Sequence, residues 1–168
     1  KEFASLLNSF QICNNMDMKT QQYIRDLDSM KKRIDEVDDD ELKSILVKLF
    51  CVRTAGLLEV FLKTRISEYS KGKVPNEINR FLTVKFKDIT NLKSSKISDV
   101  LTSFSTGWAE EFDAYIEDHE REKASLDSII AQRHNIAHGQ SSSISNALMT
   151  QYYEDVKRIV GHLDSIIR

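Results

Sequence analysis

The sequence predicts an all-α fold, an antiparallel helical bundle with a helical insertion. Only 5 Gly and 1 Pro occur in 168 residues, so few residues interrupt a helix. Apolar residues recur at steps of three and four along most of the chain, which is the period of an amphipathic helix. No internal repeat or low-complexity tract is visible, so a single bundle is expected rather than a repeat array.

The first two predicted helices carry the clearest pattern. Residues 20–37 place their apolar side chains on one stripe, and the acidic run 38–40 supplies a turn and an N-cap. The next helix runs over residues 41–70 and is the longest element, ending before Gly72, with Pro75 at a new start. The apolar positions of the two helices are Ile24, Leu27, Met30, Ile34, Val37, Leu42, Ile45, Leu46, Leu49, Val52, Leu58, Phe61, Leu62, Ile66 and Tyr69.

Shorter elements are predicted between residues 75 and 104. One short helix contains Ile78, Phe81 and Leu82, and another follows a cap at Ser94 and Ser95. Residues 83–86 are expected to form a brief extended piece. A helix then follows Gly107, and an acidic stretch leads into a helix that ends at Gly139. A serine-rich turn precedes the last helix, whose apolar positions are Ile144, Leu148, Tyr152, Val156, Ile159, Val160, Leu163 and Ile167.

Length and charge limit the class of protein. A chain of 168 residues suits one domain with one core, expected over residues 1–168, and whether it is excised from a longer chain stays open. The formal net charge of −2 excludes a protein that coats nucleic acid by bulk positive charge. No run of about 18 apolar residues and no secretory leader is visible, so neither a membrane span nor export is expected. Cys13 and Cys51 lie in apolar helix-like stretches without CxxC spacing, which predicts buried thiols in a reducing, cytoplasmic compartment.

The charge is unevenly distributed. Residues 63–96 carry nine Lys or Arg against three Asp or Glu, whereas residues 109–127 carry eight Asp or Glu against two Lys or Arg. The run 38–41 is also acidic. Two interpretations are open, a face that binds a polyanion and ordinary solvated surface.

The segment that carries chemistry is LDSIIAQRHNIAHG, residues 126–139. Arg133 follows Ile129 and Ile130 by four and three residues, so it lies on the inward side of the helix and needs an anionic partner or a cleft. A histidine exchanges protons near neutral pH, and an arginine binds phosphate through charge-assisted hydrogen bonds. Arg133 and His138 together therefore suffice for RNA cleavage without a metal or other cofactor, leaving a 2′,3′-cyclic phosphate and a 5′-OH.

Helical geometry argues against a complete site within one chain. Arg133 and His138 are separated by about 140° around the helix axis and about 7.5 Å along it. A second copy of the helix across a two-fold axis would bring two arginines and two histidines into one cleft. A site at a homodimer interface is therefore expected.

Residues 133–138, RHNIAH, resemble the Arg-polar-x-x-x-His signature of the HEPN superfamily. The flanks resemble its RiboL-PSP-HEPN branch: two isoleucines before the motif, Gly139 after it, a serine-rich turn and a tyrosine-bearing last helix that ends LDSII. The long helix with Arg53, Leu58-Glu59 and Phe61-Leu62 also looks like that branch, so the resemblance spans residues 40–168.

The resemblance implies a dimeric helical bundle with a metal-independent RNase site, in defence, toxin or RNA-processing contexts. By position, Arg133 would bind phosphate, His138 would be the acid/base, and His134 would fill the polar position that helps to orient the site. Asn135 is a further supporting candidate, and Glu59 on the long helix could orient Arg133 by a charge-assisted bond. The implied partners are RNA, a second copy of the chain, and an antitoxin or regulatory domain. A related toxin carries a tyrosine two residues after the motif histidine; Gln140 stands there in this chain, so nucleotide transfer to that position is not supported.

Alternatives remain for each residue. A non-catalytic helical module that binds RNA or a protein partner is the second interpretation of the whole chain. His134 and His138 are spaced to share a metal with His162, although Asn135 replaces the glutamate of HExxH. The structural alternatives are His138 as a helix cap, Arg133 in a salt bridge to Glu59, Ser143 or Ser145 as an N-cap, and His119 at an acidic surface. The functional alternatives are Ser143 or Ser145 as a phosphate ligand, residues 63–96 as a guide for RNA, and Tyr152 or Tyr153 as a ring that stacks on a base.

Overall fold

The computed structural model describes residues 16–168, and this part of the chain holds seven α-helices, one short 3₁₀ helix and no strand. The predicted all-α class is confirmed. The elements are α2 (Met18–Asp35), α3 (Asp40–Ser70), α4 (Asn76–Lys85), η1 (Phe86–Asp88), α5 (Ser94–Thr102), α6 (Thr106–Asp118), α7 (Glu120–Ala137) and α8 (Asn146–Ile166).

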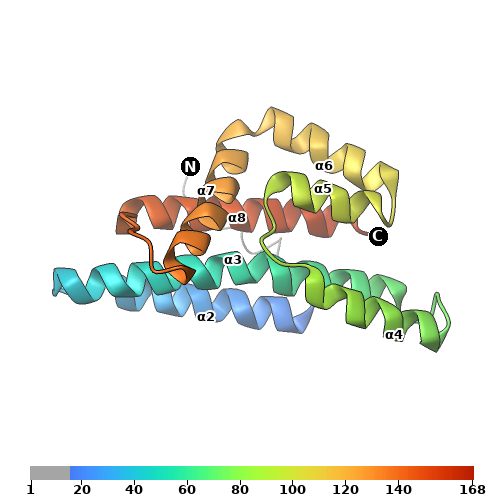
Figure 1. The fold of residues 1–168 in the computed structure, drawn as a ribbon, viewed down its shortest axis with the longest axis horizontal. Coiled ribbons are helices and arrows are strands. Elements are labelled where there is room, and N and C mark those ends of the chain that lie inside the picture. Colours follow the sequence, from blue (N-terminus) through green and yellow to red (C-terminus); the bar gives the residue numbers. More distant parts are fainter. Residues whose placement is uncertain (1–15) are drawn as a thin grey trace, which may run out of the picture.

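Helices α2 and α3 form an antiparallel pair at the base of the molecule (Figure 1). The side chain of Asp17 accepts a hydrogen bond from the Thr20 amide, and Asp39 accepts one from the Leu42 amide. Each aspartate therefore satisfies one of the free amides at a helix start. The acidic run 38–40 thus acts as the turn and cap that the sequence predicts.

Helix α3, with 31 residues, is the element around which the bundle is organised. Helix α8 lies along the same direction, whereas α7 crosses steeply over α3 and α8 (Figure 1). The core between α3 and α8 includes an edge-to-face contact of Phe50 and Tyr153, with ring centroids 5.2 Å apart. Because α7 crosses α3 near its middle, the end of α7 lies over the long helix.

The insertion between α3 and α7 contains α4, η1, α5 and α6, and it corrects one prediction. Residues 83–86, predicted as extended, belong to the end of α4 and the start of η1. Thr83 and Val84 are β-branched and favour strands in general. Here the Thr83 hydroxyl donates to the Asn79 carbonyl one turn earlier, and Phe86 is buried, so local bonds and packing favour the helix.

The start of α5 also differs from the prediction in its cap. Ser94 is the first residue of α5. It is not an N-cap whose side chain accepts a hydrogen bond from an amide of its own helix. Its amide and hydroxyl both donate to the carboxylate of Asp127 on α7, at 2.9 and 3.2 Å for Oδ1. The cap is therefore supplied by a distant helix, which ties the insertion to α7.

Cys51 is a free buried thiol, and burial raises its pKa to about 11. Its predicted burial is confirmed, and Cys13 lies outside the described residues. Within residues 16–168, none of the helices is both long and apolar enough to cross a membrane.

Candidate functional site

The RHNIAH motif forms the last turn of α7 and its cap. His138 is the capping residue, Gly139 adopts the left-handed region at φ +67°, and the Gln140 amide donates to the Asn135 carbonyl at 2.8 Å. The Gly139 amide donates to the Ile136 carbonyl at 3.2 Å, which completes a Schellman motif. Gly139 therefore ends the helix as predicted and turns the chain toward α8.

Arg133 is held by two residues from other parts of the chain. Its Nη2 lies 3.8 Å from Oε1 of Glu59 on α3, and its Nη1 donates to the side-chain oxygen of Asn91. The backbone amide of Asn91 in turn donates to Glu59 Oε1 at 3.1 Å. The contact between Glu59 and Arg133 that the sequence suggested is thus present, and Arg133 is fixed in place between α3 and the segment before α5.

Asn91 was not identified from the sequence. It adopts φ 54°, a left-handed conformation that asparagine tolerates better than most residues. This conformation lets its amide reach Glu59 while its side-chain oxygen accepts from Arg133. A lone asparagine in a connection carries no sequence signal, because its role arises only when α7 packs on α3.

Arg133 keeps part of its hydrogen-bonding capacity. The Arg133 side chain is 29% exposed and the Glu59 side chain 15% exposed. A guanidinium has five N–H donors, and only two of its nitrogens face Asn91 and Glu59. The remaining donors suit a phosphate that approaches from solvent.

The two histidines of the motif lie together on the surface. Their ring centroids are 4.3 Å apart, and both residues are exposed. Neither imidazole makes a hydrogen bond to any of residues 16–168, since only the backbone of His138 takes part in the helix cap. Both rings are therefore accessible to a ligand from solvent.

The same two histidines were also candidates for a metal site together with His162. No group of three or more His, Cys, Asp or Glu side chains in the described part of the chain is arranged to hold a metal ion. His162, considered as a third ligand, instead stacks on Tyr115 of α6, with ring centroids 3.9 Å apart.

The serines predicted as an N-cap or a phosphate ligand lie in the connection between α7 and α8, and their surroundings differ. The Ser145 hydroxyl accepts from the Leu148 amide at 3.2 Å, so Ser145 is the N-cap of α8. Ser142 donates to the Gln132 side chain at 2.7 Å and ties the connection to α7. Ser143 is exposed in this connection.

The tyrosines of α8 have different surroundings. Tyr153 is fully buried, and its hydroxyl donates to Asp28 at 2.8 Å. Tyr153 is therefore the core tyrosine that the sequence anticipated, whereas Tyr152 is half-buried.

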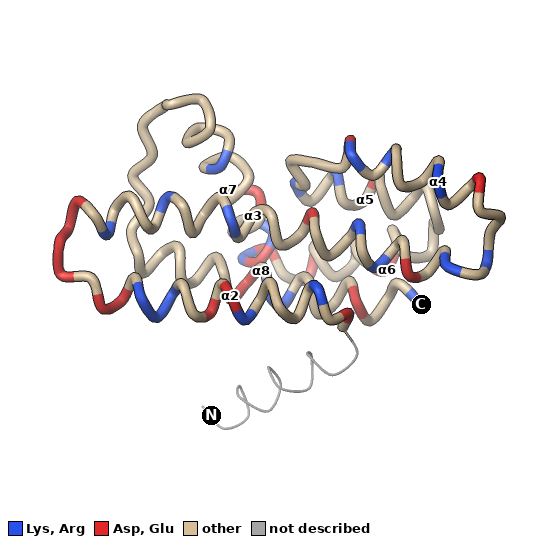
Figure 2. The backbone as a smooth tube through the Cα atoms, turned by 90° about the horizontal axis from the view of Figure 1, so that it is seen from below, with Lys and Arg blue, Asp and Glu red and all other residues tan. Residues whose placement is uncertain are grey.

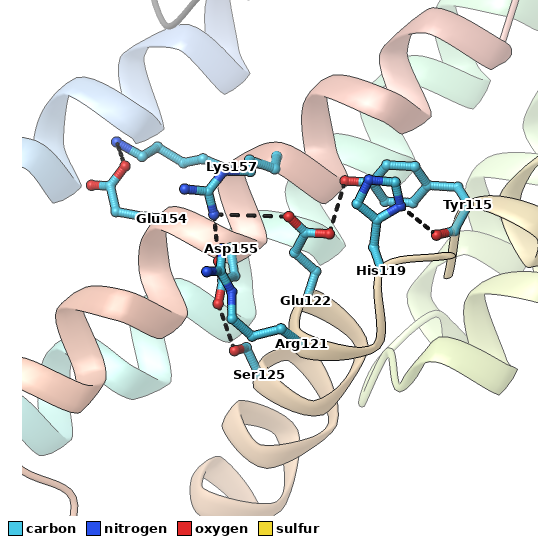
Figure 3. Close-up of polar contacts among 9 residues, drawn as sticks. Tyr115, His119, Arg121, Glu122, Ser125, Glu154, Asp155 and Lys157 are labelled. Carbon is cyan, nitrogen blue, oxygen red and sulfur yellow. Dashed lines mark hydrogen bonds and ion pairs between the residues drawn. The ribbon is translucent and has the colours of Figure 1, made fainter. Parts of the chain in front are cut away.

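A buried polar network joins α6, α7 and α8 (Figure 3). Asp155 of α8 is fully buried; it accepts from Arg121 at 2.9 Å and from Ser125 at 2.7 Å, and it pairs with Arg158. Arg158 also lies 3.9 Å from Glu122. The network holds α7 against α8 and so fixes the helix that carries the motif.

Tyr115 connects this network to two histidines. Its hydroxyl donates to Glu122 at 3.4 Å, and burial together with the charge of Glu122 raises its pKa to about 12 (Figure 3). His119 stacks on one side of the Tyr115 ring at 4.1 Å and is itself exposed, as predicted. The sequence marks this region only as acidic, because the pairing of α6, α7 and α8 is a tertiary feature.

The described residues form an all-α domain with an exposed Arg–His turn at the end of α7. Residues 19–168 match the RiboL-PSP-HEPN family. The chain therefore belongs to the RiboL-PSP-HEPN family, which indicates a nuclease-like or RNA-related module. The match begins before residue 40, where the resemblance in the sequence starts, so α2 is part of the family domain. No curated protein and no solved structure matches the chain at a significant level.

Proposed function

We propose that this protein is a metal-independent endoribonuclease that uses Arg133 and His138 in a composite site at a homodimer interface. The observation that carries the proposal is the last turn of α7. There a fixed, partly exposed arginine precedes two exposed imidazoles that have no hydrogen-bond partner within residues 16–168. Membership of an RNA-related family supports RNA as the ligand.

The chemistry needs few groups. One imidazole takes the proton of the ribose 2′-OH, and the 2′-oxygen attacks the adjacent phosphorus. The bond from phosphorus to the 5′-oxygen breaks, and a protonated imidazole gives that oxygen a proton. Arg133 stabilises the negative charge that builds on the phosphoryl oxygens. The products are a 2′,3′-cyclic phosphate and a 5′-OH, and His134 and Asn135 are assigned supporting positions.

The proposed dimer supplies what one chain lacks. The reaction uses one histidine as base and another as acid, and two copies of α7 facing each other provide them together with two arginines. An apolar stripe on α3 supports such an interface: Leu42, Ile45 and Leu49 are 48%, 56% and 49% exposed. Leu148, near the start of α8, is also exposed. Large apolar side chains gathered on a surface often mark a contact with another chain.

The direct test is cleavage of single-stranded RNA by the purified protein in the presence of EDTA. We expect the wild type to cleave and to leave 2′,3′-cyclic phosphate ends. Arg133→Ala and His138→Ala should each abolish cleavage, while Lys32→Ala, a change on the exposed face of α2, should not. Cleavage that persists in both site variants would contradict the assignment.

A second candidate is a non-catalytic module that binds RNA or a protein partner. The ion pair between Arg133 and Glu59 favours it, because a carboxylate already partly neutralises the guanidinium. This function predicts RNA binding without cleavage, and binding that His138→Ala does not weaken. A role in defence, as a toxin or in RNA processing belongs to the nuclease proposal, as does an antitoxin or regulatory partner.

A further inference from the structure

A groove lies between α3 and the helices α4 and η1. Its volume is about 460 Å³, and Lys19 of α2, Lys63 of α3 and Lys87 of η1 line it. A smaller hollow of about 250 Å³ is lined by Lys71 and shares Ser67, Thr83 and other wall residues with the first. We call the two together the α3–α4 groove. It lies in the basic part of the molecule, where Lys and Arg residues of 63–96 gather around α4 (Figure 2).

The α3–α4 groove has an excess of unpaired positive charge. Its four lysines face one carboxylate, that of Glu68. The lysines that form ion pairs within residues 16–168 are all elsewhere, namely Lys31, Lys123 and Lys157. By contrast, arginines outside the groove, such as Arg121 and Arg158, are paired with carboxylates. The groove therefore presents ammonium groups that form no ion pair with any of residues 16–168, which suits an external anion.

The other groups of the α3–α4 groove fit a phosphodiester. Thr64 and Ser67 add hydroxyl groups beside the ammoniums, and phosphate oxygens are commonly bound by lysine and by Ser or Thr hydroxyls. Phe86, which is mostly buried, gives the wall an apolar surface against which a ribose can pack. Burial and the nearby charge of Asp17 raise the pKa of Glu68.

The α3–α4 groove begins next to the candidate site. Glu59, Lys63 and Ser67 follow one another at four-residue steps on α3, so each lies about 6 Å further along the helix than the one before, and Lys71 is the residue that caps the helix end. The first of them, Glu59, is the residue that holds Arg133. The part of this row that lines the groove, from Lys63 to Lys71, is about 12 Å long, more than a single phosphate occupies, so the geometry favours a chain of phosphates.

We propose that the α3–α4 groove binds the sugar-phosphate backbone of single-stranded RNA and leads it to the turn that carries Arg133. The choice of RNA among polyanions rests on the proposed function. Contacts to the backbone alone would make this binding independent of base sequence and sensitive to salt.

The test is binding of a labelled 2′-O-methyl oligouridylate of about ten nucleotides, followed by fluorescence anisotropy at several salt concentrations. This probe lacks the free 2′-OH, so binding is measured without cleavage. We expect Lys63→Gln combined with Lys87→Gln to weaken binding roughly tenfold at low salt. The slope of log K against log salt should become shallower by about 0.7 for each phosphate that the variant no longer neutralises.

The matched control is Lys32→Gln combined with Lys43→Gln, the same charge change at the far ends of α2 and α3. The control should bind like the wild type, and the charge-preserving pair Lys63→Arg and Lys87→Arg should restore binding. Equal affinity of the groove and control variants would overturn the proposal, as would equal affinity of the wild type for polyglutamate of similar charge. A groove variant with weakened binding supports the proposal even if the wild type cleaves no RNA, an outcome that would contradict the nuclease assignment alone.

Discussion

Arg133 depends on residues that are distant from it in sequence. Glu59 comes from the middle of α3 and Asn91 from the connection before α5, and both contact the same guanidinium. The sequence predicted Arg133, His134, Asn135 and His138 because they lie together in one six-residue motif. It also suggested Glu59, because an arginine on the inward side of a helix needs an anionic partner, and Glu59 on the long helix can supply one. It could not indicate Asn91, whose role depends on a backbone conformation.

Glu59→Gln tests whether the ion pair positions Arg133. The change keeps the size of the side chain and removes its charge, so we expect the guanidinium to lose orientation and RNA cleavage to slow by roughly tenfold, equivalent to about 1.4 kcal/mol. Stability should fall by roughly 1–3 kcal/mol, since the Arg133 and Glu59 side chains are only 29% and 15% exposed and the charged acceptor is lost, so the rates are compared where both proteins are fully folded. Cleavage kinetics and thermal unfolding measure both effects. An unchanged cleavage rate would show that Glu59 has no positioning role.

His162 predicts a pH dependence of stability. Burial lowers its pKa in the folded protein, because the charged imidazolium is poorly solvated there. The unfolded state therefore binds more protons as the pH falls, and this contribution to the free energy of unfolding decreases below about pH 6.5. We expect His162→Phe, which keeps a ring against Tyr115, to flatten the change between about pH 7.5 and about pH 5.5. Urea unfolding at several pH values measures it, and an identical pH profile in the variant would contradict this role of His162.

At the scale of elements, the helix ends were the most predictable feature. Asp39, Ser145 and Gly139 act as the caps that their residue types favour, because capping depends on a few neighbouring atoms. Residues 83–86 were predicted wrongly. The β-branched Thr83 and Val84 favour strands, but the packing of Phe86 and the helical hydrogen bonds outweigh this preference. The exposure of Leu42, Ile45 and Leu49 was also unpredictable, since apolar periodicity does not say which face a neighbour covers.

The junction of α7 and α8 depends on Asp155. Its carboxylate is almost fully buried and has three partners, so Asp155→Ala should leave Arg121 and Arg158 without their shared anion and Ser125 without its acceptor. The two arginine side chains are 62% and 48% exposed and can be solvated, so the loss comes mainly from the buried Ser125 hydroxyl without its acceptor and is roughly 1–3 kcal/mol. Urea unfolding should show that loss, and Asp155→Asn should lose less because it can still accept from Ser125. A loss below about 1 kcal/mol for the alanine variant would show that the network is not what joins these helices.

At the scale of the whole molecule, the proposed composite site requires a dimer. Ile45→Glu combined with Leu49→Glu places two charges on the exposed stripe of α3, where neither residue contributes to the core. We expect the monomer to keep its helical content and thermal stability but to lose dimerisation and RNA cleavage. Light scattering after gel filtration measures the mass, and the same double change at Ile78 and Phe81 of α4 is the control. A variant that stays dimeric would exclude this stripe as the interface.

The most direct test of a composite site mixes the wild type with His138→Ala. Exchange of subunits creates heterodimers that hold both Arg133 side chains but only one His138. The proposed reaction uses the His138 of one protomer as base and that of its partner as acid. A composite site therefore predicts that the heterodimers, identified by native mass spectrometry, do not cleave RNA in EDTA. Heterodimers that still cleave RNA would contradict it, because one protomer would then hold a complete site.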